Sequence, residues 1–309
     1  MKNTIKYELS VMVHKKEFLF SLCAMTLFSL VSFMNISDVY KVFLIDRSTV
    51  LSPVDVFIGS ENAPYSNYFK YVFAFLVVLP YSMSYINDTE TGVMPALLTR
   101  CSKNQYIASK IIACFIGNVL IIAIPFVFNF ILCNIAFPVQ GNYCFGEMGL
   151  SGYFKTIIGT NVAVNTPYTG IPFLKLFIYS PTLYAILIII INSVASGVFG
   201  AFLLCISFVI KKARPLLFLP LYSLIMAGNI IDAQMYSNSI VANGKYIDFK
   251  IMDYFVLSTW YGRSPYFIIC VFSIMAVVGI FCLFIGSRGD KMVLSGGGSY
   301  DKTGKKNAS

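Results

Sequence analysis

Residues able to bind a nucleotide or a metal ion are few in this chain, and their spacing does not complete a site. Residues 298–306 contain the glycines and the lysine of a phosphate-binding loop, but five residues separate the glycines instead of four. Lys306 also stands where that loop needs a serine or threonine. The single histidine, His14, is not accompanied by a Cys-x-x-Cys pair, so no zinc site is predicted. We therefore expect the chain to bind no cofactor and no metal.

Catalytic groups are also missing from the apolar segments of the sequence. An intramembrane hydrolase needs a nucleophile beside a base, and an ion-coupled carrier needs ionisable side chains within the bilayer. No Asp, Glu, Lys, Arg or His lies deep within any of the long apolar segments. The chain is therefore predicted not to be an enzyme, and a transporter that powers itself with an ion gradient is disfavoured.

A polar stretch at residues 86–111 lies between two long apolar segments and is the best candidate for a binding surface. Asp88 or Thr89 is predicted to cap a helix, because a short side-chain oxygen can accept from the free N–H groups of a first turn. Glu90 adds a negative charge near the positive end of the same helix dipole. The stretch therefore has the start signals of a helix.

The residues that follow have the spacing of a short amphipathic helix. Val93, Ala96 and Leu97 recur at helical intervals, and Arg100 and Lys103 follow them. We predict that this helix lies across the cytoplasmic face of a membrane and forms a docking surface, with a basic linker leading into the next apolar segment. The alternative is an ordinary basic loop on the cytoplasmic side.

The same stretch carries motifs of a transporter family. Glu-Thr-Gly at 90–92, Leu-Leu-Thr-Arg at 97–100 and Ser-Lys-Asn-Gln-Tyr at 102–106 resemble the segment between the second and third spans of type-2 ABC exporter permeases. The resemblance implies a coupling helix that sits on a separate ATPase subunit, in a complex of two permease and two ATPase subunits. Cys101 stands where the family often has proline, which leaves the geometry at the end of the helix open. The residues assigned to ATPase coupling are Asp88, Glu90, Gly92, Leu97, Leu98, Arg100 and Lys103.

The composition is that of a protein with several membrane spans. Of the 309 residues 57% are hydrophobic and 12% are charged, and the mean hydropathy is +0.75, whereas soluble domains are about 45–50% apolar and about 25% charged. The net charge is +9, and 15 of the 23 basic but only 6 of the 14 acidic residues fall in segments predicted to be cytoplasmic. The positive-inside rule explains this balance without a nucleic acid partner and favours a multi-pass protein of the cell membrane.

An all-α polytopic fold with six transmembrane helices is predicted, because about 20 apolar residues span a bilayer. An interfacial amphipathic helix at 3–16 precedes the first span, and both termini are expected to be cytoplasmic. Residues 1–286 form a single transmembrane domain, followed by a disordered cytoplasmic tail at 287–309. The predicted spans are 18–34, 69–86, 107–137, 173–210, 216–231 and 266–285.

Small and polar residues within the spans predict how the helices pack. Asn118 and Asn129 are eleven residues apart, which is about three helical turns, and so share one face. Their amides are predicted to hydrogen-bond between helices in preference to facing a transport pathway. Two pairs of small residues in the fourth span predict close helix packing: Ser193 with Gly197, and Ser196 with Gly200.

Two features are predicted between the fifth and sixth spans. Asn243-Gly244 is the preferred pair for a type I′ turn, so a hairpin is expected with Ile240-Val241 in one strand. Residues 251–261 are apolar and aromatic enough to re-enter the membrane or to lie on its outer face.

The function predicted from these patterns is that of the membrane-spanning permease subunit of an ATP-driven exporter. Such a subunit couples ATP hydrolysis by a separate ATPase subunit to the export of a substrate. A second permease subunit and membrane lipid are the other expected partners. The alternatives are a membrane scaffold or sensor that docks a cytoplasmic partner without moving a substrate, and a channel.

Overall fold

The computed structural model describes residues 2–43, 53–60, 66–137, 143–144, 147–148, 176, 179–210, 214–242, 248–255 and 265–296, which are mostly helical. The α-helices are α1 (Lys2–Val13), α2 (Lys16–Phe43), α3 (Pro53–Val56), α4 (Ser66–Val78), α5 (Ser84–Glu90), α6 (Val93–Leu98), α7 (Lys103–Ala136), α10 (Pro181–Ser207), α11 (Phe218–Ala242) and α12 (Pro265–Gly296). The shorter elements are the 3-10 helices η3 (Arg214–Leu217) and η4 (Ile251–Phe255) and an antiparallel pair of strands, β1 (Tyr143–Cys144) and β2 (Glu147–Met148).

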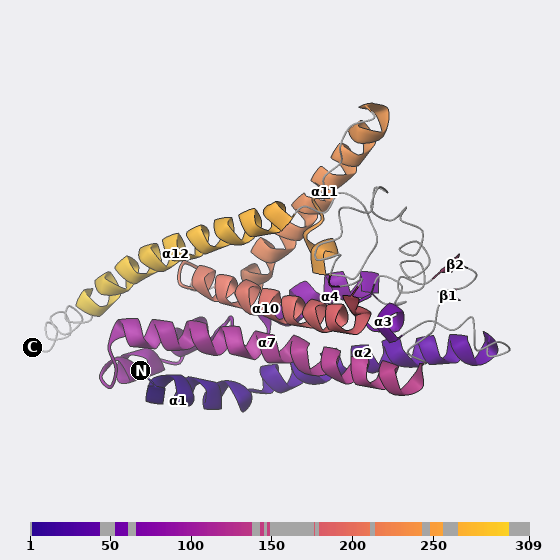
Figure 1. Cartoon of the computed structure of the whole chain (residues 1–309). Coiled ribbons are helices and arrows are strands. Elements are labelled where there is room, and N and C mark those ends of the chain that lie inside the picture. Colours follow the sequence, from indigo (N-terminus) through magenta and orange to yellow (C-terminus); the bar gives the residue numbers. More distant parts are fainter. Residues whose placement is uncertain are drawn as a thin grey trace, which may run out of the picture.

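Helix α7 packs against α1, α2, α3 and α10, and α12 packs in turn against α10 (Figure 1). α1 and α2 run alongside α7 in the same direction, with Met12 against Gly117 and the Ser29 hydroxyl donating to the Pro125 carbonyl at 3.1 Å. α10 and α12 run the opposite way (Figure 1). The start of α1 and the end of α12 therefore lie at the same end of the molecule.

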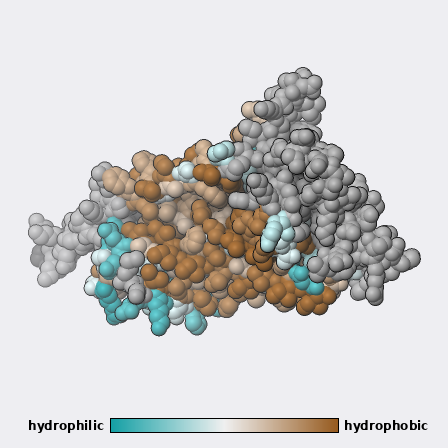
Figure 2. Space-filling view, in the orientation of Figure 1, coloured by the Kyte–Doolittle hydropathy of each residue, from teal (hydrophilic) through white to brown (hydrophobic). Residues whose placement is uncertain are grey.

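Four helical segments of the described chain are long and apolar enough to cross a membrane: Lys16–Ser37, Lys103–Ala136, Thr182–Ser207 and Tyr266–Gly286. They correspond to the first, third, fourth and sixth predicted spans. Figure 2 shows an apolar surface over the middle of the molecule, with hydrophilic residues gathered at the end where α1 lies. The prediction of a mostly helical fold is confirmed, and four long apolar helices are what a membrane-embedded chain requires.

The segment predicted as the second span is not one continuous helix. α4 ends at Val78 and α5 starts at Ser84, with a turn between them that contains Pro80. Proline lacks the N–H that would continue the helix, and its ring clashes with the preceding turn. α4 alone has 13 residues, which is too short to cross a bilayer at about 1.5 Å per residue.

Helix α11, which covers most of the fifth predicted span, continues beyond the predicted end of that span at residue 231. α11 runs to Ala242, so Ile240-Val241 is helical and the predicted hairpin strand is wrong; residues 243–247 lie outside the described chain. The helix passes through Asp232 because that buried carboxylate has partners. It accepts from the Phe249 N–H at 3.1 Å and pairs with the Lys250 ammonium at 3.0 Å.

Other boundaries differ as well: α2 continues to Phe43 instead of ending at residue 34, and α7 begins at Lys103 instead of residue 107. α10 begins at Pro181 instead of residue 173, because Ser180 caps it by accepting from the Leu183 N–H. α12 continues to Gly296, so the first part of the predicted disordered tail is helical, since adding residues to an existing helix is far easier than starting one. Residues 297–309 lie outside the described chain.

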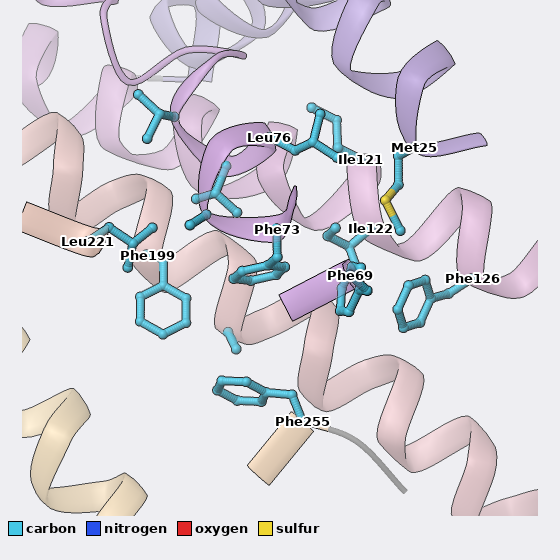
Figure 3. Packing of buried hydrophobic residues seen from close by; sticks show 14 of the residues in the cluster. Met25, Phe69, Phe73, Leu76, Ile121, Ile122, Phe126, Phe199, Leu221 and Phe255 are labelled. Carbon is cyan, nitrogen blue, oxygen red and sulfur yellow. The ribbon is translucent and has the colours of Figure 1, made fainter. Parts of the chain in front are cut away.

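Aromatic side chains from several elements meet in the core (Figure 3). Phe199 of α10 packs edge-on against Phe73 of α4 at 5.8 Å and against Phe255 of η4 at 6.0 Å between ring centroids. The Asn192 amide of α10 also donates to the Phe255 carbonyl at 2.6 Å. Residues 251–255 thus lie inside the bundle, while 256–261 lie outside the described chain.

The small residues predicted for packing lie where α10 meets α7. A Cβ at Gly197 would lie 2.7 Å from the Phe115 ring, and one at Gly200 would overlap the Asn118 amide. The Ser196 hydroxyl donates to the Asn118 carbonyl at 3.0 Å. Ser193 bonds to Ile189 of its own helix instead and borders an apolar groove of about 400 Å³ between α7 and α10. The two helices are close because these residues have small side chains.

The two asparagines of α7 are buried, and each is placed against a different neighbour. The Asn129 amide donates to the Ser29 carbonyl at 3.0 Å, and its oxygen accepts from the Ile58 N–H at 2.9 Å. The Asn118 amide donates to the Cys114 carbonyl of α7 itself at 3.0 Å, so the predicted hydrogen bond between helices is wrong for this side chain, which lies beside Gly200 of α10. Asn129 therefore joins α7 to α2 and to the segment after α3, which is the packing role predicted from its type.

Candidate functional site

The segment α5–α6, predicted as the docking region, is a pair of short helices joined by a tight turn. Gly92 stands at the start of α6 with φ 70°, and no side chain caps that helix. Thr89 lies within α5, where its hydroxyl donates back to the Tyr85 carbonyl at 2.9 Å. The prediction that Asp88 or Thr89 caps the docking helix is therefore wrong, because the glycine turn separates them from it.

Helix α6 presents a small mixed surface and buries one side chain. Met94 is buried, and Leu97 and Leu98 are half-buried against the core. Val93 is 43% exposed, and Ala96 is also exposed on the same helix. The residues exposed on α6 and just after it are Val93, Pro95, Ala96, Thr99 and Arg100.

Behind α6 lies a buried ion network centred on Lys110 of α7. The Lys110 ammonium is 2.8 Å from Asp88 Oδ2 of α5 and 3.3 Å from Glu8 Oε2 of α1. The side chains of Lys110 and Glu8 are 1% and 3% exposed, and that of Asp88 is 19% exposed. One lysine therefore joins three helices that are distant in the sequence.

Two tyrosines complete the network on the same carboxylate oxygens. The Tyr81 hydroxyl donates to Glu8 Oε2, and the Tyr106 hydroxyl donates to Asp88 Oδ2 at 2.9 Å. The Lys110 ammonium also lies 5.1 Å from the centroid of each of these rings. Each carboxylate thus has a cation and a neutral donor, which is what a buried charge requires.

A second lysine borders the network from the junction of α1 and α2. The Lys15 ammonium lies 4.6 Å from the centroid of the Tyr81 ring. Burial and the nearby Lys110 charge lower the pKa of Lys15, and the opposing effect of the neighbouring carboxylates does not cancel them. Lys15 is therefore held by the ring and by longer-range attraction, and Lys110 forms the direct ion pairs.

Removing a single charged member of the network is expected to destabilise the fold. Removing one partner of a buried ion pair leaves the other charge without compensation, which typically costs about 3–5 kcal/mol. Replacing all members with neutral groups of similar volume is often tolerated. The arrangement therefore fixes the relative positions of α1, α5 and α7 more than it adds to stability.

Of the residues predicted to couple to an ATPase, Asp88 belongs to this network and faces inward. Gly92 makes the turn, Leu97 and Leu98 partly pack inward, and Arg100 is exposed. Glu90 is the last residue of α5, and Lys103 is the first residue of α7. The predicted docking residues thus divide into an inner anchor, a turn and an outer edge.

Two members of the network, Glu8 and Tyr81, were not singled out from the sequence, whereas Tyr106 and Lys110 were placed only in the motif and the basic linker of the polar stretch at 86–111. A signal was present for Glu8, which lies three residues after Ile5 and four before Met12 and so shares their apolar helical face. A carboxylate on an apolar face requires a buried partner. The identity of that partner could not be read from the sequence, because Lys110 is 102 residues away.

Among the described residues, no group of three or more His, Cys, Asp or Glu side chains could hold a metal ion. No family model, no curated protein and no solved structure matches the chain.

Proposed function

We propose that the chain is the membrane-spanning permease subunit of an ATP-driven exporter, and that α6 docks a separate ATPase subunit. The observation that carries the proposal is the position of α6. It exposes Val93, Ala96 and the adjacent Arg100 beside the start of α7, next to the buried network that joins α1, α5 and α7. The motif at 90–106 that resembles exporter permeases covers the same residues.

Six passes through the membrane are part of this proposal, with α4–α5 as the second and α11 as the fifth. α4 runs opposite to α7, since Phe69 packs on Phe126 at 5.2 Å between ring centroids while Tyr81, further along, lies by Lys110. An even number of alternating passes places both ends of the chain on the same side, and the positions of the start of α1 and the end of α12 in Figure 1 support this. We assign that side to the cytoplasm.

Thiol labelling tests this topology. A cysteine at Tyr179 or Tyr266, which are 82% and 80% exposed at the outer ends of α10 and α12, should react from outside with a membrane-impermeant maleimide. A cysteine at the exposed Asn104 should react only after the membrane is opened. Ser60 is buried and cannot serve as a reporter. Labelling at Asn104 in intact cells would contradict the layout.

Purification from native membranes tests the function itself. We expect an ATP-hydrolysing subunit to co-purify with the chain, together with a second permease subunit. Its rate of ATP hydrolysis should differ between the complex in lipid and the free ATPase subunit. A co-purified ATPase subunit whose rate of ATP hydrolysis is the same in the complex and alone would favour a scaffold or sensor. Ion conductance by the purified chain without any partner would favour a channel.

A further inference from the structure

The buried network assigns a role to the first helix of the chain. We propose that Lys110 is a positioning residue that makes α1 move together with the α5–α6 segment when the ATPase changes its nucleotide state. This inference rests on the proposed function, because it assumes that a partner acts on α6. It adds that α1 is a moving part of the coupling device and that one ion bridge carries the motion.

The first step concerns the path from α6 inward. α6 buries Met94 fully and packs Leu97 and Leu98 only partly against the core, so its own packing opposes a displacement less than that of a long helix would. α5 precedes it across the short turn at Gly92, and Asp88 of α5 is fixed by Lys110 at 2.8 Å and by the Tyr106 hydroxyl at 2.9 Å. A displacement of α6 is therefore passed to Asp88 and from there to Lys110.

The second step concerns the path from Lys110 to α1. Glu8 is buried, and its Oε2 atom accepts from both the Lys110 ammonium and the Tyr81 hydroxyl. One turn further along α1, Met12 is buried against Gly117 of α7. Tyr81 lies in the turn between α4 and α5, so both contacts of Glu8 lead back to segments that adjoin the docking region. Glu8 is thus the charged link between α1 and the docking region, while Met12 packs α1 against α7.

The third step concerns why ionic residues are present at all. Neutral groups of similar volume often hold a fold as well as a buried ion pair does. Two carboxylates that share one lysine differ from such packing, because a shift of either carboxylate changes the force on the other through the common cation. The arrangement therefore suits transmission between two elements better than it suits simple stability.

A neutral triple variant separates transmission from stability. Glu8→Gln, Asp88→Asn and Lys110→Met together remove all three charges while keeping similar volumes, so the chain should fold and still bind its ATPase through the unchanged surface of α6. Spin labels at cysteines placed at Tyr7 of α1 and at Tyr179, which are 52% and 82% exposed, would report the position of α1. The distance between the labels is compared in the purified complex with ATP and with ADP plus vanadate.

We expect the distance to change between the two nucleotide states in the otherwise unaltered complex and to stay constant in the triple variant. A matched double variant of exposed charges at the start of α2, Lys16→Met with Glu17→Gln, should retain the change. A change that persists in the triple variant, or no change in the unaltered complex, would overturn the role of Lys110. If no ATPase co-purifies with the unaltered chain, the proposed function fails as well, so the two failures are distinguishable.

Discussion

Val93→Asp should release the ATPase subunit while the membrane helices stay folded. Val93 is 43% exposed on α6, so the substitution disturbs the outer edge and not the core. Burying a valine against a partner contributes about 1.5–3 kcal/mol, and a carboxylate in its place adds a desolvation cost. The affinity should therefore fall by at least about tenfold. A pull-down titration measures this, with size-exclusion chromatography in detergent as the folding control.

Two other substitutions distinguish loss of the ATPase contact from loss of folding in the same pull-down assay. Arg100→Ala removes an exposed charge, and a rim ion pair is worth only about 0–1 kcal/mol, so the loss should be small. Leu97→Asp should weaken both docking and folding, because Leu97 is half-buried against the core of its own chain. Full affinity of the Val93→Asp variant for the ATPase would show that α6 is not the contact.

Gly200→Leu should prevent the chain from folding. A Cβ at this position would already overlap the Asn118 amide of α7, and a leucine adds three further carbon atoms to the same space. Overpacking a tight core costs about 1–3 kcal/mol for small increments, so Gly200→Ala should be measurably destabilised and Gly200→Leu severely so. Yield of monodisperse protein and thermal unfolding in detergent provide the measurement.

Two glycines serve as controls for this effect. A Cβ at Gly279 of α12 would lie 3.6 Å from Cys205 Cβ, which is ordinary contact, so Gly279→Ala should be tolerated. Gly92→Ala meets open space but must adopt φ 70°, which costs about 1–2 kcal/mol for a residue with a side chain. Normal folding of Gly200→Leu would show that α7 and α10 do not approach as closely as described.

The sequence predicted elements whose cause is local. The long apolar segments are helices, and the small residues of α10 lie at its contact with α7, because hydrophobicity and side-chain size can be read residue by residue. Element ends were predicted less well. Pro80 interrupts the second predicted span, as the local effect of proline indicates, whereas Asp232 does not end α11, since its partners Phe249 and Lys250 come from another segment.

In the docking region, too, the sequence predicted the features with a local cause and not those that depend on long-range contacts. The short helix α6 follows from the spacing of Val93, Ala96 and Leu97, and the exposed outer edge follows from its composition. The inward direction of Asp88 does not, because it depends on Lys110 and Glu8 meeting across more than 100 residues of chain. Long-range ion pairs are a property of the fold, and a single sequence does not carry a spacing rule for them.

Photo-crosslinking from α6 tests the account most directly. A photoreactive amino acid at Val93, activated in intact cells, should form a covalent product that mass spectrometry identifies as an ATP-binding subunit. The same amino acid at Val31, which is 50% exposed within the membrane-spanning part of α2, provides the matched control and should not form that product. A product with an ATP-binding subunit from Val93 alone is the predicted result. Absence of that product at Val93, or its equal formation at Val31, would contradict the proposed docking surface.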